Sequence, residues 1–127
     1  MTVYAALIIV FIHWFADFVC QTNKQAMGKS KAWEPLLSHT AMYSVVWFIV
    51  TMVLGCCLGE SIVPLRMMWF APITFLAHTA TDYYTSRVNS VLATKEDKHD
   101  FFVSIGFDQF LHYAQLFITY DMLMKMN

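Results

Sequence analysis

Four long blocks of apolar residues constrain the fold of this chain more than any other feature. With the isolated His and Asp residues inside them counted, the blocks cover about residues 3–22, 36–59, 66–88 and 101–124. Each block reaches the roughly 20 residues that an α-helix needs to cross the hydrocarbon core of a bilayer. The whole chain is 58% hydrophobic and only 13% charged, which is too little charge to cover a soluble domain of this size. The sequence therefore predicts an all-α, polytopic membrane protein, with residues 1–127 forming a single bundle of four transmembrane helices.

The basic residues predict how these helices are oriented. The loops that join the first block to the second and the third to the fourth carry Lys24, Lys29, Lys31, Arg87, Lys95 and Lys98. The opposite side has only Arg66 and Lys125. By the positive-inside rule the two loops face the cytoplasm, which places both termini outside it and the protein in the inner (cytoplasmic) membrane. We interpret these charges as topology signals, with attraction of phosphate or anionic headgroups as the alternative.

Pairs of His and Asp at helical spacing recur in three of the blocks. The pairs are His13 with Asp17, His78 with Asp82, and Asp108 with His112. A step of four residues on an α-helix puts both side chains on one face, so each pair can present an imidazole and a carboxylate to the same point. At about 1.5 Å of rise per residue, the pairs and His39 of the second block lie at a similar depth in the membrane.

Charged groups at that depth need partners. An ionised Asp near the bilayer centre costs roughly 2.5–3.5 kcal/mol on insertion scales. The sequence places no Lys or Arg at this depth, which leaves protonation, hydrogen bonds between His and Asp, or a bound cation. A hydrogen-bonded packing role is the structural alternative, because polar side chains also join membrane helices.

The mixture of imidazoles and carboxylates is typical of a site for a divalent metal, with zinc favoured and manganese or iron as alternatives. The predicted metal ligands are His13, Asp17, His78, Asp82 and His112. Catalytic roles are predicted for Asp108, as a bridging ligand or general base, and for His39, as a further ligand or the acid that protonates the leaving group.

Four further residues are candidates for supporting the ligands or contacting the substrate. They are Gln21, Gln109, Tyr43 and Arg87. Gln21 lies one more helical step beyond Asp17, and Gln109 adjoins Asp108, so their amides can reach the same face. The net charge of −1 and the lack of a Gly-rich phosphate loop or a basic recognition helix argue against a nucleic-acid partner.

These residues also carry a resemblance to a known family. The segments concerned, which span nearly the whole chain, are His13 to Gln21, His39, His78 to Arg87 and Gly106 to His112. They resemble the signature of a small integral membrane family of bacteria and their phages, catalogued as a domain of unknown function. The resemblance implies a four-helix membrane protein and no established activity.

A more distant likeness concerns the His-x3-Asp pairs alone. They are similar to pairs in inner-membrane proteins labelled metal-dependent hydrolases and in the helical zinc-dependent phospholipase C fold. The chain lacks that fold's N-terminal Trp ligand and its closing His-x3-Glu, so this likeness is an analogy of site chemistry.

These observations favour a membrane-embedded, metal-dependent hydrolase that acts from the cytoplasmic side on a phosphoester of a lipid or of a small nucleotide-like molecule. One alternative is a small ion- or proton-coupled transporter, in which the same groups bind an ion or relay protons. Another is a non-catalytic phage or bacterial effector that contacts a host membrane protein. In each case the lipid bilayer is a partner, and a chain of 127 residues is short enough for a homodimer to help enclose the site.

Overall fold

The computed structural model describes residues 1–59, 63–96 and 98–126, and in these residues it contains helices and no strand. The elements in chain order are α1 (Val3–Trp14), the π-helical turn η1 (Phe15–Val19), α2 (Asn23–Gly28), α3 (Trp33–Leu58), the 3-10 helix η2 (Leu65–Trp69), α4 (Phe70–Leu92) and α5 (His99–Lys125). The prediction of an all-helical protein is confirmed. The first helix ends earlier than the sequence indicated, and the loop after it contains the additional short helix α2.

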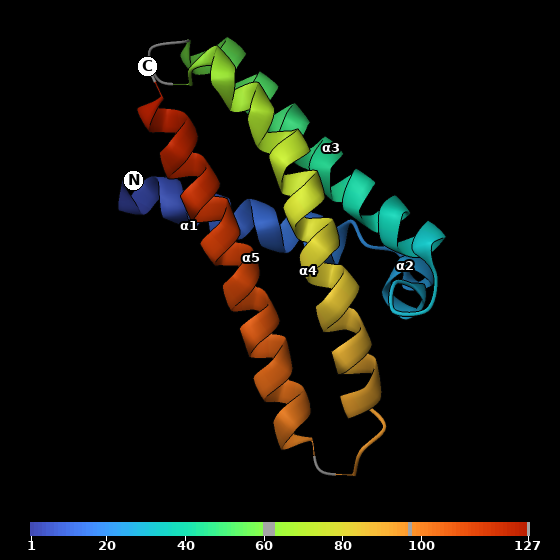
Figure 1. The fold of residues 1–127 in the computed structure, drawn as a ribbon. Coiled ribbons are helices and arrows are strands. Elements are labelled where there is room, and N and C mark those ends of the chain that lie inside the picture. Colours follow the sequence, from blue (N-terminus) through green and yellow to red (C-terminus); the bar gives the residue numbers. More distant parts are fainter. Residues whose placement is uncertain (60–62, 97, 127) are drawn as a thin grey trace.

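The three long helices form the body of the molecule. Helix α4 contacts both α3 and α5, and Figure 1 shows the three lying alongside one another. Helix α1 differs from them, because it crosses behind α5 at a steep angle instead of running parallel to it. It contacts α5, and the π-helical turn that follows it contacts α3. The N-terminal segment thus closes one side of the α3–α4–α5 layer.

Among the described residues, α3 is the helix that is both long enough and apolar enough to cross a membrane. The segment Val3–Val19 is apolar but shorter. Helices α4 and α5 have 23 and 27 residues, which is sufficient length, but their sequences are interrupted by the polar residues that face the interior. The structure therefore supports one membrane span directly, where the sequence predicted four.

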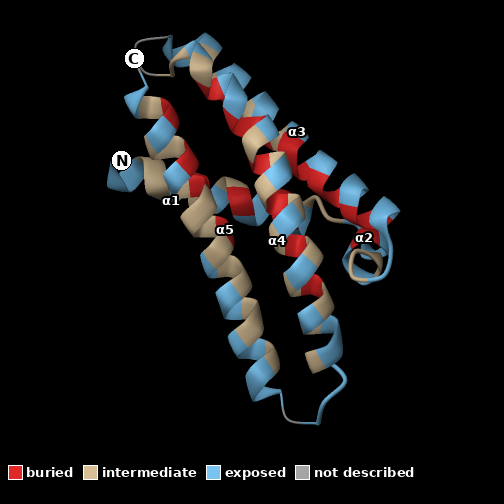
Figure 2. Ribbon diagram, in the orientation of Figure 1, coloured by how far each residue is buried: buried red, intermediate tan, exposed pale blue. Residues whose placement is uncertain are grey.

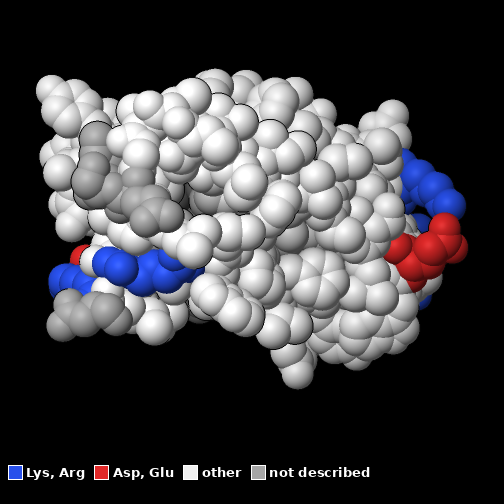
Figure 3. All heavy atoms as spheres, turned by 90° about the horizontal axis from the view of Figure 1, so that it is seen from above, with Lys and Arg blue, Asp and Glu red and all other residues white. Residues whose placement is uncertain are grey.

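Polar side chains make up an unusual share of the interior. The fully buried side chains include four His residues, Thr and Asp beside apolar ones such as Phe70 and Leu116. Figure 2 shows buried positions as red bands along α3 and α4. Large apolar side chains such as Leu7, Phe11, Phe110 and Ile118 are instead more than 60% exposed. The face drawn in Figure 3 is almost entirely uncharged, with Lys, Arg, Asp and Glu atoms gathered at its two ends. An apolar surface around a polar interior marks a protein that is embedded in lipid or covered by a partner.

Helix α2 is fixed against the start of α3. Its N-terminus has a capping box, in which the Thr22 hydroxyl accepts the Gln25 backbone N–H and the Gln25 side chain accepts the Thr22 backbone N–H. The Gln25 amide also donates to Ser38 Oγ on α3 at 3.0 Å. At its C-terminus, Gly28 packs so closely on Pro35 that a Cβ there would lie 2.8 Å from the proline ring. These contacts give α2 a defined position at one end of the bundle.

This close approach predicts that Gly28→Ala destabilises the protein by about 1–3 kcal/mol, because the added methyl group overpacks the contact with Pro35. Thermal unfolding in detergent, followed by circular dichroism, measures the change. Gly106→Ala is the matched control, because a Cβ at Gly106 meets nothing within 4 Å and the helix propensity of Ala is higher. Equal or greater stability of Gly28→Ala would contradict the packing argument.

Candidate metal centre

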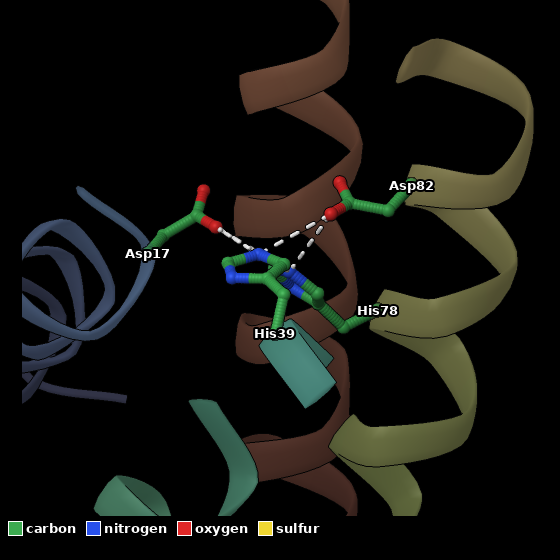
Figure 4. A group of neighbouring side chains, drawn as sticks. All are labelled: Asp17, His39, His78 and Asp82. Atoms are coloured by element: carbon green, nitrogen blue, oxygen red, sulfur yellow. Dashed lines mark hydrogen bonds and ion pairs between the residues drawn. The ribbon is translucent and has the colours of Figure 1, made fainter. Parts of the chain in front are cut away.

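Two carboxylates and two imidazoles from three elements meet in the interior. Asp17 comes from η1, His39 from α3, and His78 and Asp82 from α4; Figure 4 shows their side chains converging. Each of the four is at most 4% exposed. The α4 pair has regular α-helical geometry, so the predicted spacing of four residues puts both side chains on the same inward face.

The distances within this group match those between the ligands of one metal ion. Asp17 Oδ1 lies 3.0 Å from His39 Nε2 and 3.4 Å from His78 Nε2. Asp82 Oδ2 lies 3.3 Å and 3.5 Å from the same two nitrogens, which are 3.2 Å apart. In a tetrahedral site with bonds of about 2.0–2.1 Å, neighbouring ligand atoms are about 3.3 Å apart. Five of the six separations among the four atoms are therefore close to those that a zinc-sized ion requires.

A second group adjoins the first and shares Asp82 with it. His112 Nε2 on α5 lies 3.4 Å from Asp82 Oδ1 and 3.4 Å from Asp108 Oδ1. The ligand atoms of Asp82, Asp108 and His112 all lie within 4.8 Å of one another, as do those of the first group. Asp82 thus directs one oxygen to each group. This is the arrangement of a carboxylate that bridges two cations.

Several of these atoms are buried without a hydrogen bond among the described residues. They include Asp17 Oδ1, Asp108 Oδ1 and His112 Nε2. Buried polar atoms are rarely left in this state. A cation in the first group would satisfy Asp17 Oδ1, and a cation in the second would satisfy Asp108 Oδ1 and His112 Nε2.

His13 lies beside the groups and is not part of either. Its Nε2 is 3.0 Å from Gln109 Oε1, so this nitrogen carries the proton, and its Nδ1 accepts the Tyr43 hydroxyl at 2.7 Å. The distance from His13 Nε2 to Asp17 Oδ2 is 3.7 Å. Both ring nitrogens of His13 are therefore paired with other side chains, Tyr43 and Gln109. Of the predicted metal ligands, the structure brings Asp17, His78, Asp82 and His112 into the two groups, together with His39 and Asp108.

Aromatic rings hold the imidazoles in place. The Tyr43 ring stacks on His78 with a centroid distance of 4.0 Å, and His112 stacks on His78 from α5 at 4.2 Å. Gln109 connects the two sides of the cluster, since its amide also donates to Asp108 Oδ2 at 3.2 Å. Tyr43 and Gln109 therefore occupy the supporting positions that the sequence indicated.

Two predicted supporting residues have other surroundings. The Arg87 guanidinium lies 3.8 Å above the Tyr83 ring and donates to the Tyr83 carbonyl at 2.6 Å. The Gln21 side-chain oxygen is buried and has no hydrogen bond among the described residues. The structure brings neither side chain to the atoms of the two groups.

The approach of Lys29 to the buried carboxylates was not predicted from the sequence, which placed this lysine in an aqueous loop. Its ammonium lies 2.9 Å from Asp82 Oδ2, and its side chain is 17% exposed. Burial alone would lower the pKa of Lys29, but the carboxylates of Asp82 and Asp17 outweigh it and raise that pKa above its usual value. The expectation that no basic group accompanies the buried carboxylates is wrong, because α2 folds back and delivers this lysine. The capping signal Thr22-x-x-Gln25 in the sequence could have indicated this helix.

The bond between Tyr43 and His13 predicts that Tyr43→Phe destabilises the protein by about 1–3 kcal/mol, because it leaves His13 Nδ1 buried without a donor. Thermal unfolding in detergent measures the loss. Tyr113→Phe is the matched control: that ring also packs edge-on against His13, at 5.0 Å, but its hydroxyl does not hold the imidazole. Equal losses of stability in the two variants would show that the hydrogen bond to His13 does not cause the destabilisation.

Among the comparisons with known proteins, one with family models relates this chain to a protein family. A search of curated proteins and a search of solved structures each returned no match. A family model described as "Protein of unknown function (DUF3307)" matches residues 4–127, which is nearly the whole chain and includes every residue of both groups. The family resemblance seen in the sequence motifs agrees with this match. On that basis, the chain belongs to the DUF3307 family.

Proposed function

We propose that this protein is a membrane-embedded hydrolase that uses a pair of divalent metal ions to cleave a phosphoester. The observation that carries the proposal is the position of Asp82, whose two oxygens face two adjoining sets of buried ligand atoms. In two-metal sites the ions lie about 3.5–4 Å apart, activate a water molecule and stabilise the attacking and leaving oxygens of a displacement. Phosphoester hydrolysis is the reaction that such pairs typically perform.

The geometry refines the roles proposed for the individual residues. The first ion would be held by Asp17, His39, His78 and Asp82, and the second by Asp82, Asp108 and His112. Asp82 therefore takes the bridging role that the sequence suggested for Asp108. His39 is better placed as a ligand than as the acid for the leaving group, because its Nε2 lies among the ligand atoms.

The donor set and the burial favour zinc, with manganese or iron as alternatives. The first set combines two imidazole nitrogens with two carboxylate oxygens, which suits these metals and not calcium or magnesium. The second set has three protein ligands and includes Asp108, whose side chain is 13% exposed. A position open to water in the second set is what a catalytic site needs.

The proposal places the helices in the inner membrane. At about 1.5 Å per residue, α3, α4 and α5 are each about 35–40 Å long, which exceeds the roughly 30 Å hydrocarbon core. Their exposed faces are apolar and their polar residues face inward, as expected of helices surrounded by lipid. Lys24, Lys29 and Lys31 lie at the end of the bundle nearest the metal groups, which is the cytoplasmic side by the positive-inside rule.

An apolar groove favours a lipid as the substrate over a small nucleotide-like molecule. The groove has a volume of about 520 Å³ and lies between α1, α3, η2 and α5, with Ile9, Ile12 and Met67 in its lining. Trp47 forms part of its wall and packs against Tyr43, the ring that stacks on His78. The rings of Trp47 and Tyr43 would lie between a hydrocarbon chain in this groove and His78 of the metal groups.

One observation supports a second candidate, a proton- or ion-coupled carrier. Beyond the metal groups, Gln115 donates to Thr74 Oγ1 at 3.3 Å and to Thr119 Oγ1 at 3.0 Å. Thr74 and Thr119 are buried, so the polar interior extends along α4 and α5 past the cluster. Polar groups in a membrane interior can relay protons.

The bridging role of Asp82 gives a prediction for metal content, measured by plasma mass spectrometry on detergent-purified protein without a polyhistidine tag. We expect about two equivalents of metal in the wild type, about one in Asp17→Asn and in Asp108→Asn, and almost none in Asp82→Asn. The same variants are expected to lose at least about 100-fold in hydrolysis of chromogenic phosphomonoesters or phosphodiesters.

Asp121→Asn is the matched control for this series. Asp121 is also on α5, but it is exposed and pairs with Lys125 at 2.6 Å, so the variant should keep both ions and full activity. A folded wild type that takes up no metal on titration would disprove the metal centre. Stoichiometric metal without phosphoester hydrolysis, together with pH-dependent flux in liposomes, would favour the carrier.

A further inference from the structure

Lys29 pairs with a carboxylate oxygen that a bound metal ion would also contact. Its Nζ lies 2.9 Å from Asp82 Oδ2, which is the same oxygen that lies 3.3 Å from His39 Nε2 and 3.5 Å from His78 Nε2. The ammonium therefore neutralises the carboxylate that both ion sites require. This interaction is distinct from the surface pair of Lys24 with Glu34, in which both side chains are nearly 80% exposed.

A filled metal centre would weaken this contact. An ion bound to Asp82 Oδ2 at about 2.0–2.1 Å would lie within a few ångströms of the ammonium. Two cations at such a distance repel strongly in a partly buried site. The four-carbon stem of Lys is flexible, so its ammonium can withdraw while the backbone stays in place. The backbone is held by the capping box of α2 and by the packing of Gly28 on Pro35.

The withdrawn ammonium would remain at the entrance to the site. Lys29 and Asp108 are the most exposed members of the cluster, at 17% and 13%, whereas the other side chains in it are at most 5% exposed. These two residues therefore lie nearest the solvent within the cluster. An ammonium at that point is positioned to pair with a non-bridging oxygen of a phosphate group, as lysines do in many phosphate sites.

We propose that Lys29 is a displaceable internal cation that pairs with Asp82 before metal binds and with the phosphate group of the ligand after metal has bound. The inference rests on the proposed metal centre and adds the residue that recognises the anionic part of the substrate. It assigns to Lys29 a role in binding the substrate. The chemistry recognised is a phosphate with free anionic oxygens, carried either by a soluble molecule or by a lipid headgroup.

Metal affinity tests the first half of this proposal without any assay of activity. Zinc dissociation constants are measured by competition with a chromogenic chelator for the wild type, Lys29→Gln, Lys29→Arg and Lys24→Gln. Lys29→Gln should bind zinc at least about tenfold more tightly, because the competing charge is gone. Lys29→Arg keeps that charge and should stay near the wild type. Lys24→Gln alters the exposed pair with Glu34 and should not change the affinity.

Phosphate binding to the zinc-loaded protein tests the second half. Inorganic phosphate in solution and phosphatidic acid in mixed micelles are titrated separately, and Lys29→Gln should bind the recognised ligand about tenfold more weakly than the wild type and Lys24→Gln do. Binding of inorganic phosphate would show that a soluble phosphate is sufficient for recognition by Lys29. Binding of phosphatidic acid alone identifies the lipid headgroup.

The outcomes separate this inference from the function on which it rests. A wild type that binds no zinc overturns the metal centre itself, and the role of Lys29 with it. A wild type that binds two zinc ions, with unchanged or weaker zinc affinity in Lys29→Gln, overturns the displacement alone. Phosphate affinity that is unchanged in Lys29→Gln, or absent from the loaded wild type for both ligands, overturns the anion-binding role.

Discussion

The burial of Asp17 and Asp82 in an apolar helical protein is the constraint on which the rest of the structure depends. Ionised carboxylates in such an interior are strongly destabilising unless cations or hydrogen-bond donors surround them. Several elements of the fold meet that requirement: α3, α4 and α5 supply imidazoles, and Lys29, the residue that follows α2, supplies an ammonium. The polar cluster therefore joins helices that also pack through a buried apolar core, which includes Trp47, Phe70 and Leu116.

The α-helical pairs were predictable because they depend on local geometry. His78 with Asp82 and Asp108 with His112 lie on unbroken helices, so a spacing of four residues was sufficient to bring each pair inward. The pair His13 with Asp17 behaves differently, because the π-helical turn begins at Phe15, between the two residues. The wider turn directs Asp17 toward His39 and His78, while His13 pairs with Tyr43 and Gln109. Single π-helical turns of this kind occur frequently at functional sites.

Tertiary contacts account for what the sequence did not reveal. Lysines in a polar loop are typical topology signals. Nothing in their spacing predicts that the Lys29 side chain pairs with Asp82. The steep crossing of α1 is likewise set by packing against α5 and not by its own apolar pattern, which is equally suited to a parallel helix. The choice of Asp82 over Asp108 as the shared carboxylate depends on α4 lying between α3 and α5, a relation that no local motif encodes.

The distribution of the cluster along the chain has a consequence for folding. Asp17 lies near one end of the sequence and His112 near the other, and they approach two neighbouring side chains of α4, His78 and Asp82 respectively. Two ions that share Asp82 would connect both ends of the chain to α4 in the folded state, because the ligand residues come together only on folding. Ligand binding and global stability are then thermodynamically coupled, and the midpoint of unfolding rises with the concentration of the free ion.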